Sequence, residues 1–315
     1  MPENKNNPRV IFMGTPHFSA EILLVLLDHK YNICAAFTQP DKKVGRKQIL
    51  EKSPVKVLAE KNDIPVFTPN KLDQEAVAIA KNLNPDLIIL VAYGKILPQA
   101  FLDLPKTGAV NIHPSLLPKF RGPSPIQNAL LEGEKITGTT IMLMDAGMDT
   151  GDILKQESIE ILPDETYFEL EEKLIRLSSR LLLEVLPELI DQKIIPQKQD
   201  GAKATYCRMI AKNDGQLDWR ASSEMIYNKY RAFASWPGIF TYWNSKRLKL
   251  NMISLAPKEV SQHDIGEVFK INDALYVQAG NGAIELKEVQ LEGKPNMQIS
   301  DFVNGQKNFI GSILA

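Results

Sequence analysis

Leu87-Ile88-Ile89-Leu90-Val91 is an uninterrupted apolar run, and it decides the fold class of this chain. A run without polar alternation is typical of a strand that is covered on both faces of a sheet. Upstream, Val10–Met13 and Ile33–Phe37 are also predicted strands, and the apolar spacing between Phe18 and His29 predicts a helix that joins them. This order of strand, helix and strand predicts an α/β protein with a parallel sheet.

The pattern changes toward the middle of the chain. Gly138–Leu143 and Ile153–Ile161 predict neighbouring β-strands, joined by a loop with two aspartates. Thr166 and Glu169 form a capping box ahead of a stripe of leucines, which predicts a long helix. Pro187 is expected to bend or end that helix.

Three segments follow from these patterns. Residues 1–192 are the predicted α/β domain, and residues 193–205 are a polar, proline-bearing linker. In residues 206–315, short β-like runs recur between turn formers after one amphipathic helix. About five short strands predict a small β-barrel of the oligonucleotide-binding (OB) type, with a generic β-domain as the alternative.

Composition places the chain among ordinary globular proteins of the cytoplasm. It has 315 residues, of which 44% are hydrophobic and 24% charged, with a net charge of −1 and two cysteines. No cysteine spacing predicts a disulfide framework or a zinc site, and no apolar run suggests a signal peptide or a membrane span. The turn after the first strand, Gly14-Thr15-Pro16, lacks the further glycines of a nicotinamide site. A near-neutral chain can hold a nucleic acid only through local basic patches.

Asn111 and His113 are the first candidate functional residues. Asn111 lies near the end of a predicted strand, Gly108–Ile112, and His113 follows just beyond it. The two share a face because strand side chains repeat every second residue. In open α/β sheets the carboxyl edge is where ligands bind. A structural role is the more common one for an Asn-x-His pair, and the position at a strand end brings the two interpretations level.

The loop after Leu143 offers a carboxylate. Asp145 and Asp149 both lie in it, and local chemistry alone does not choose between a functional carboxylate and a residue that caps the turn at Gly151. An amide, an imidazole and a carboxylate together suffice to move an acyl group onto an amine.

Seven ordered motifs carry a resemblance to one family. They are Phe12-Met13-Gly14-Thr15-Pro16, Thr38-Gln39-Pro40-Asp41, Ser53-Pro54-Val55-Lys56, Val91-Ala92-Tyr93-Gly94, Asn111-Ile112-His113-Pro114-Ser115-Leu116-Leu117-Pro118, Arg121-Gly122 and Asp149-Thr150-Gly151-Asp152-Ile153. In these motifs the chain resembles the methionyl-tRNA formyltransferases, from about Val10 to beyond Trp236-Pro237-Gly238.

The resemblance implies a Rossmann-like formyltransferase domain followed by an OB-like domain that binds tRNA. It implies 10-formyltetrahydrofolate as donor, methionyl initiator tRNA as acceptor, and a role in translation initiation. No metal is implied, and a monomer is the default. The implied catalytic residues are Asn111, His113 and Asp149, and the residues implied to contact the folate are Ser115, Leu116, Leu117 and Pro118.

These residue types suit direct formyl transfer. Asn111 would donate to the formyl oxygen, and Asp149 would orient the imidazole and favour its charged form. His113 would either share the oxyanion as imidazolium or carry the amine proton to the folate nitrogen as imidazole. The sequence leaves that division open.

Cations suggest where a tRNA would be held. Lys42, Lys43, Arg46 and Lys47 lie in a segment with little secondary-structure pattern. A basic loop is often only a solvated surface, but a cationic loop after a strand also suits contacts with phosphates. A second predicted patch in the β-domain consists of Lys246, Arg247 and Lys249.

Other functions remain open on the sequence alone. The nearest is a folate-dependent formyltransferase acting on a small amine such as an amino sugar nucleotide, or a formyltetrahydrofolate hydrolase. The basic loop argues against both. A non-catalytic tRNA-binding protein would not need the intact set of Asn111, His113 and Asp149.

Overall fold

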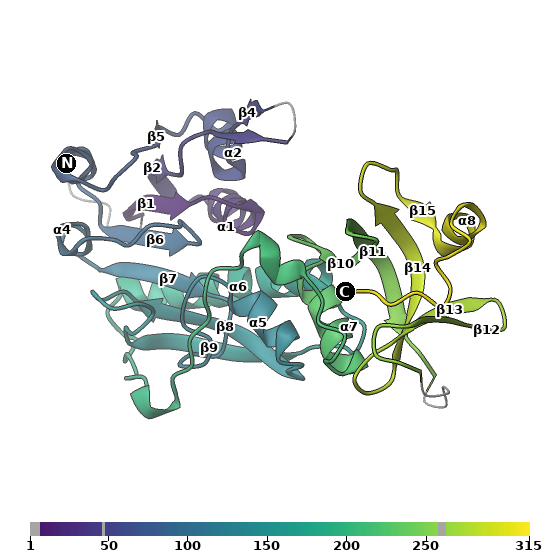
Figure 1. Ribbon diagram of the computed structural model, residues 1–315. Coiled ribbons are helices and arrows are strands. Elements are labelled where there is room, and N and C mark those ends of the chain that lie inside the picture. The colour runs from purple at the N-terminus through teal and green to yellow at the C-terminus, as the bar shows by residue number, and fades with distance from the viewer. Residues whose placement is uncertain (1–6, 46–47, 258–262) are drawn as a thin grey trace. The chain divides into compact units, whose positions relative to one another are not determined.

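The structure is a computed structural model that describes residues 7–45, 48–257 and 263–315. The chain divides into two compact units, which are described separately (Figure 1). The first comprises Met1–Pro125, Ile136–Glu160 and Glu171–Arg208; the second comprises Ile126–Lys135, Ile161–Leu170 and Met209–Ala315. Within the described ranges, no helix has the length and apolar character needed to cross a membrane.

A seven-stranded sheet with the order β5-β2-β1-β6-β7-β8-β9 forms the core of the first unit. The first five strands in this order, β5, β2, β1, β6 and β7, pair in parallel, as expected. The last two, β8 and β9, add an antiparallel edge. The short loop between β8 and β9 permits only antiparallel pairing. The strands are β1 (Arg9–Gly14), β2 (Asn32–Phe37), β5 (Val66–Phe67), β6 (Leu87–Val91), β7 (Ala109–His113), β8 (Ile136–Leu143) and β9 (Ile153–Glu160). The predicted α/β class is confirmed.

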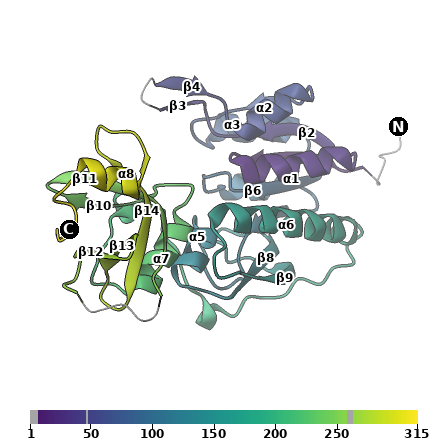
Figure 2. The ribbon, with the colours of Figure 1, turned by 90° about the vertical axis from the view of Figure 1, so that its right-hand side faces the viewer.

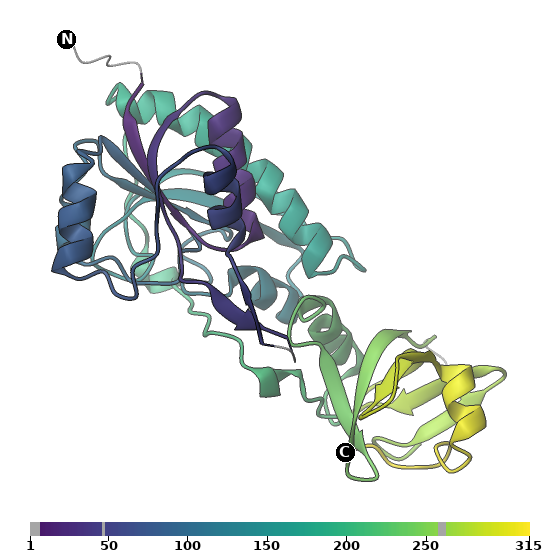
Figure 3. The same ribbon diagram turned by 90° about the horizontal axis from the view of Figure 1, so that it is seen from above.

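Helices cover both faces of this sheet. Figures 2 and 3 show α3 on one face and α1 and α6 on the other. On the α3 side, alternate strand residues such as Ile11, Met13 and Ile88 form a buried core with Phe101 of α4. The helices are α1 (His17–Asp28), α2 (Pro54–Lys61), α3 (Gln74–Asn82), α4 (Gln99–Leu102) and α6 (Tyr167–Ile190), of which α6 begins in the second unit.

The long helix α6 begins as the sequence predicts. The backbone N–H of Thr166 donates to Oε2 of Glu169 at 2.9 Å, which is the reciprocal bond of a capping box. The helix continues past Pro187 and ends at Ile190. The segment that follows has one short 3-10 helix, Gly201–Lys203, and its residues through Arg208 belong to the first unit.

The basic segment after β2 is more ordered than the sequence indicates. Lys42–Val44 (β3) pairs with Ile49–Glu51 (β4) as an antiparallel hairpin, with Lys43 opposite Leu50. The expectation of little regular structure is therefore wrong here. Each strand is too short to show a periodic pattern in the sequence.

The second unit contains an antiparallel sheet with the order β10-β11-β14-β13-β12, and β15 pairs with β14. Its outermost strands, β10 and β12, are bonded by neighbouring residues of one C-terminal segment, 311–315. Ala315 exchanges two backbone hydrogen bonds with Tyr242 of β10, and Gly311 and Ser312 bond Val268 of β12. These bonds attach both edges of the sheet to one C-terminal segment. The second unit is thus an antiparallel β-domain, the more general of the two predicted alternatives.

The remaining elements complete this unit. They are α5 (Pro125–Leu131), which begins in the first unit, the 3-10 helix Lys212–Gly215, α7 (Ser223–Ala232), β10 (Ile239–Trp243), β11 (Lys246–Leu255), β12 (Val268–Ile271), β13 (Ala274–Gln278), β14 (Ala283–Leu291), β15 (Met297–Gln298) and α8 (Ile299–Gly305). The predicted amphipathic helix and the five predicted strands are all present in it.

Candidate active site

Strand β7 presents Asn111 and His113 on one face at the carboxyl edge of the sheet. Both side chains are buried, with exposed fractions of 5% and 4%. Strands on both sides of β7 fix the face to which these side chains point, because Leu90 of β6 pairs with Asn111 and Thr140 of β8 pairs with His113. The amide and the imidazole therefore lie side by side, as the sequence predicts.

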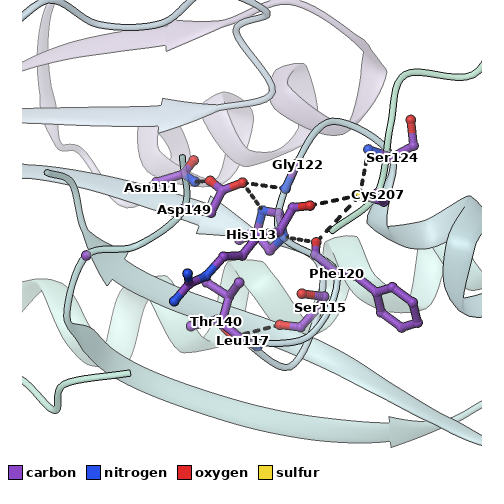
Figure 4. A network of polar contacts seen from close by, with 12 residues as sticks. Asn111, His113, Ser115, Leu117, Phe120, Gly122, Ser124, Thr140, Asp149 and Cys207 are labelled. Carbon is purple, nitrogen blue, oxygen red and sulfur yellow. Dashed lines mark hydrogen bonds and ion pairs between the residues drawn. The ribbon is translucent and has the colours of Figure 1, made fainter. Parts of the chain in front are cut away.

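Asp149 joins them from the loop between β8 and β9 (Figure 4). Its Oδ2 accepts a hydrogen bond from the backbone N–H of Gly122 at 2.8 Å, and its Oδ1 lies 3.3 Å from Nδ2 of Asn111. Oδ2 also lies 3.7 Å from Nδ1 of His113. The three predicted catalytic residues thus form one cluster in the first unit.

The structure separates the two aspartates of the loop. Oδ1 of Asp145 accepts from the backbone N–H of Gly147 at 3.0 Å and from the hydroxyl of Thr150 at 2.6 Å. This exposed carboxylate closes its own turn, whereas Asp149 is turned to Asn111 and His113. Of the two residues that the sequence left open, Asp149 is the one at the site.

A backbone carbonyl determines which nitrogen of His113 is available. Nε2 lies 2.9 Å from the carbonyl oxygen of Phe120, which can only accept, so Nε2 carries a hydrogen and donates it. Nδ1 is left facing Asp149 at 3.7 Å, which is too long for a hydrogen bond. Of the two ring nitrogens, Nδ1 is therefore the one that can accept a hydrogen bond.

The loop after β7 holds the four residues expected to contact a folate. Ser115 and Leu117 are buried in the loop itself, and the Ser115 hydroxyl donates to the carbonyl of Lys119 at 2.6 Å. Thr140 ties the loop to β8, because its hydroxyl donates to the Ser115 carbonyl and accepts from the Leu117 N–H. Leu116 and Pro118 remain half-buried. They are the members of the set with side-chain surface left for a ligand.

The predicted tRNA contacts are placed as follows. Lys42 and Lys43 are exposed on strand β3. Arg46 and Lys47 lie outside the described residues. Neighbouring lysines are already paired: Lys52 with Glu60 at 2.7 Å and Lys56 with Asp41 at 2.8 Å.

The second cationic patch is divided between two faces of its sheet. On β11, Arg247 and Lys249 share one face, and the Arg247 guanidinium lies 3.6 Å from the ring centroid of Phe240. Lys246 is on the other face, at the start of the strand. The structure therefore brings two of these three residues together.

Two contacts of the site could not be predicted from residue types. The carbonyl of Phe120 and the N–H of Gly122 act through backbone atoms, so their side chains carry no signal. In the sequence, Arg121-Gly122 stands out only as one of the seven motifs of the family resemblance. In the part of the chain that the structure describes, no group of three or more His, Cys, Asp or Glu residues could hold a metal ion.

Comparisons with known proteins identify the family of the chain. The formyl transferase family model matches residues 8–186, and the model of the formyl transferase C-terminal domain matches residues 209–307. The chain is 46% identical over 311 residues to methionyl-tRNA formyltransferase of Caldicellulosiruptor saccharolyticus, covering 97% of this chain and 99% of that protein. It is 43% identical over 297 residues to methionyl-tRNA formyltransferase of Geobacter metallireducens, covering 94% and 95%.

Solved structures show a shared fold at lower identity. A variant of HypX from Aquifex aeolicus matches with a TM-score of 0.67 at 17% identity, over 98% of this chain and 51% of HypX. The chain thus spans about half the length of HypX. WlaRD, a sugar 3N-formyl transferase, matches with a TM-score of 0.65 at 19% identity, over 91% of this chain and 99% of that one. By its full-length identity to its relatives and its match to both family models, the chain belongs to the methionyl-tRNA formyltransferase family.

Proposed function

We infer that this protein is an enzyme that transfers the formyl group of 10-formyltetrahydrofolate to the amino group of methionyl initiator tRNA. The product, formylmethionyl-tRNA, serves translation initiation. The observation that carries this conclusion is the cluster of Asn111, His113 and Asp149 at the carboxyl edge of the sheet, in a chain that matches formyltransferases along its length.

We propose that Asn111 stabilises the charge that develops on the formyl oxygen. The amine nitrogen of the acceptor attacks the formyl carbon, a C–N bond forms, and the carbonyl oxygen becomes negative. One hydrogen of the Asn111 amide faces Asp149, which leaves the second for this oxygen. Collapse of the tetrahedral intermediate breaks the bond to N10 of the folate.

His113 moves the proton that this exchange releases. Nδ1 accepts the proton of the attacking amine and returns it to N10 of the leaving folate, so the reaction is balanced without any covalent enzyme intermediate. The Asp149 carboxylate, 3.7 Å away, stabilises the positive charge that the ring carries in between. The bond from Nε2 to Phe120 keeps the ring in this orientation throughout.

The residues after β7 fit a folate donor. Leu116 and Pro118 provide apolar, half-buried surface in the loop that follows the strand of Asn111 and His113, and apolar surface with a few polar groups is typical of small-molecule sites. Ser115 and Leu117 support this surface from within the loop. We propose that residues 1–192 carry the chemistry and that residues 206–315, beyond the 193–205 segment, help to hold the tRNA.

The choice of acceptor is tested by supplying 10-formyltetrahydrofolate with one acceptor at a time. We expect formyl transfer to methionyl initiator tRNA and none to uncharged tRNA, to an amino sugar nucleotide or to water. Transfer to the sugar amine alone, or hydrolysis of the donor alone, would support the corresponding rival and overturn this conclusion. Tight tRNA binding without any transfer would indicate a non-catalytic tRNA-binding protein.

The β3–β4 hairpin is the proposed contact with tRNA phosphates, through Lys42 and Lys43 and the neighbouring Arg46 and Lys47. Replacing Lys42 and Lys43 together by alanine is expected to weaken tRNA binding and to reduce the slope of log K against log salt by up to about 0.9 for each phosphate that is no longer neutralised. Binding of the folate donor is expected to stay unchanged. Filter binding of tRNA at several salt concentrations measures both the affinity and the slope.

A matched control removes the same charge from the opposite edge of the sheet. Lys61 and Lys81 are exposed and lie in the last turns of helices α2 and α3, ahead of the amino ends of the strands that follow. The double alanine variant at these positions is expected to bind tRNA as the unchanged protein does. Equal weakening by both pairs would mean that only net charge matters.

In the second unit, we propose that Arg247 and Lys249 contact tRNA from one face of β11, with Arg247 held by the Phe240 ring. Lys246 would reach phosphates from the other face. The enzyme is proposed to act as a monomer in the cytoplasm, where tRNA and folate are both available.

A further inference from the structure

The segment that follows α6 forms backbone hydrogen bonds with the chain around Asp149. Gln197 exchanges two backbone hydrogen bonds with Ile153, at the end of the Asp149 loop. Farther along, the N–H of Arg121 donates to the carbonyl of Thr205, and the N–H of Cys207 donates to the carbonyl of Arg121. Residues 197–207, here called the strap, thus pair with the two chain segments that surround Asp149.

Between these anchor points, one side chain of the strap contacts both segments. Nε2 of Gln199 donates to the carbonyl oxygen of Asp149 at 2.9 Å and to that of Gly151 at 2.8 Å. Its Oε1 accepts from Nε and Nη2 of Arg121 at 3.1 and 2.7 Å. A primary amide has two hydrogens to donate and two lone pairs to accept with, so every bonding position of Gln199 is used.

Arg121 fixes the orientation of this amide. Its guanidinium is buried, with 5% of the residue exposed, and it can only donate. If the Gln199 amide turned over, its NH₂ group would face the guanidinium and its oxygen would face two carbonyl oxygens. Both contacts would then be repulsive, so the observed orientation is the only one that satisfies all partners.

The backbone that Gln199 holds is the backbone of the candidate catalytic carboxylate. Asp149 has φ 53°, in the left-handed region, which Asp adopts more readily than most residues with a side chain, and Gln199 binds its carbonyl in this conformation. This conformation directs Oδ2 to the N–H of Gly122, the residue after Arg121. Gln199 and Gly122 therefore hold Asp149 from its two ends, the backbone and the carboxylate.

We propose that Gln199, oriented by Arg121, is a positioning residue that keeps the Asp149 carboxylate in place beside Asn111 and His113. The inference rests on the proposed function, because it acts through the catalytic role assigned to Asp149. Gln199 need not touch either substrate for this role.

Gln199→Glu tests the geometry with almost no change of shape. The new carboxylate keeps its bonds to Arg121 but places an oxygen, and a negative charge, where the NH₂ group met two carbonyl oxygens. We expect kcat to fall by about ten- to a hundredfold, since small displacements of a catalytic group carry losses of that order. The KM values for donor and tRNA are expected to stay close to those of the unchanged protein.

A double-mutant cycle with Asp149→Asn separates positioning from general damage. If Gln199 acts through Asp149, then Gln199→Glu should have little further effect on kcat once Asp149 is replaced. An equal loss of kcat in both backgrounds would overturn the proposal, and so would a higher KM for tRNA with kcat unchanged. Gln199→Ala, which removes the amide without adding a charge, serves in the same cycle if the glutamate variant does not fold.

Two controls keep the outcomes distinct. Gln192→Glu makes the same chemical change at an exposed side chain ahead of the strap, and it is expected to leave kcat unchanged. If Asp149→Asn itself kept full activity, the catalytic assignment of Asp149 would fail and the positioning role with it. If Asp149→Asn loses activity and Gln199→Glu does not, only the positioning role is wrong.

Discussion

Replacing His113 by glutamine is expected to lower kcat for formyl transfer by about 10²- to 10⁴-fold, the range that general acid–base catalysis contributes. The glutamine amide can reach the position of Nε2 and still donate to the carbonyl of Phe120, so the buried bond is kept. No titratable nitrogen remains to face Asp149 and the substrate. The loss should therefore fall on the chemical step, and single-turnover transfer to methionyl initiator tRNA measures it.

The control for this variant is His29→Ala. His29 is exposed at the end of α1, and Nδ1 of its ring lies 2.8 Å from the local carbonyl oxygen of Val25. We expect this variant to retain full activity, and thermal unfolding should show that both proteins are folded. A glutamine variant as active as the His29 variant would show that proton transfer does not pass through His113.

Asn111→Ala is the second large effect. It removes the amide proposed to stabilise the formyl oxygen in the transition state, and loss of one such donor costs about 2.7–4 kcal/mol, or roughly 10²- to 10³-fold in kcat. KM for tRNA should change little, because the interaction exists only as charge develops on the oxygen. Steady-state kinetics with each substrate varied in turn makes this comparison.

A second variant at Asn111 distinguishes loss of the donor from loss of packing. Asn111 also donates toward Oδ1 of Asp149, so Asn111→Asp would set two carboxylates against each other at the site. That variant should lose at least as much activity as the alanine variant, although it fills the same volume. Asn82→Ala, at an exposed position of α3, is the matched control. An active Asn111→Asp enzyme would contradict the donor role.

The sequence predicts the sheet and the Asn111–His113 pair because both depend on local signals. Leu87–Val91 is a strand for reasons that lie within the run itself. Asn111 and His113 share a face because they are two residues apart in a strand, which geometry alone ensures. Their meeting with Asp149 followed from the resemblance, and the structure supplies the distances.

The sequence does not predict contacts that depend on distant backbone. Phe120 orients His113 through its carbonyl, and Gly122 binds Asp149 through its N–H, so neither side chain identifies the contact. Gln199 lies in a polar segment without periodicity and reaches the carbonyl of Asp149, 50 residues earlier. Such a residue acquires its partners only when the chain has folded back on itself. The β3–β4 hairpin is missed for another reason, because its strands are too short to show a pattern.

The C-terminal segment that bonds β10 and β12 also protects the protein from strand pairing between molecules. An outermost strand with free N–H and C=O groups can pair with a strand of another molecule and begin aggregation. In the second unit, Ala315 occupies backbone groups of β10 at Tyr242, and Gly311 and Ser312 occupy those of β12 at Val268. A chain shortened before Gly311 would free these groups on both strands, and intermolecular pairing would compete with the native sheet.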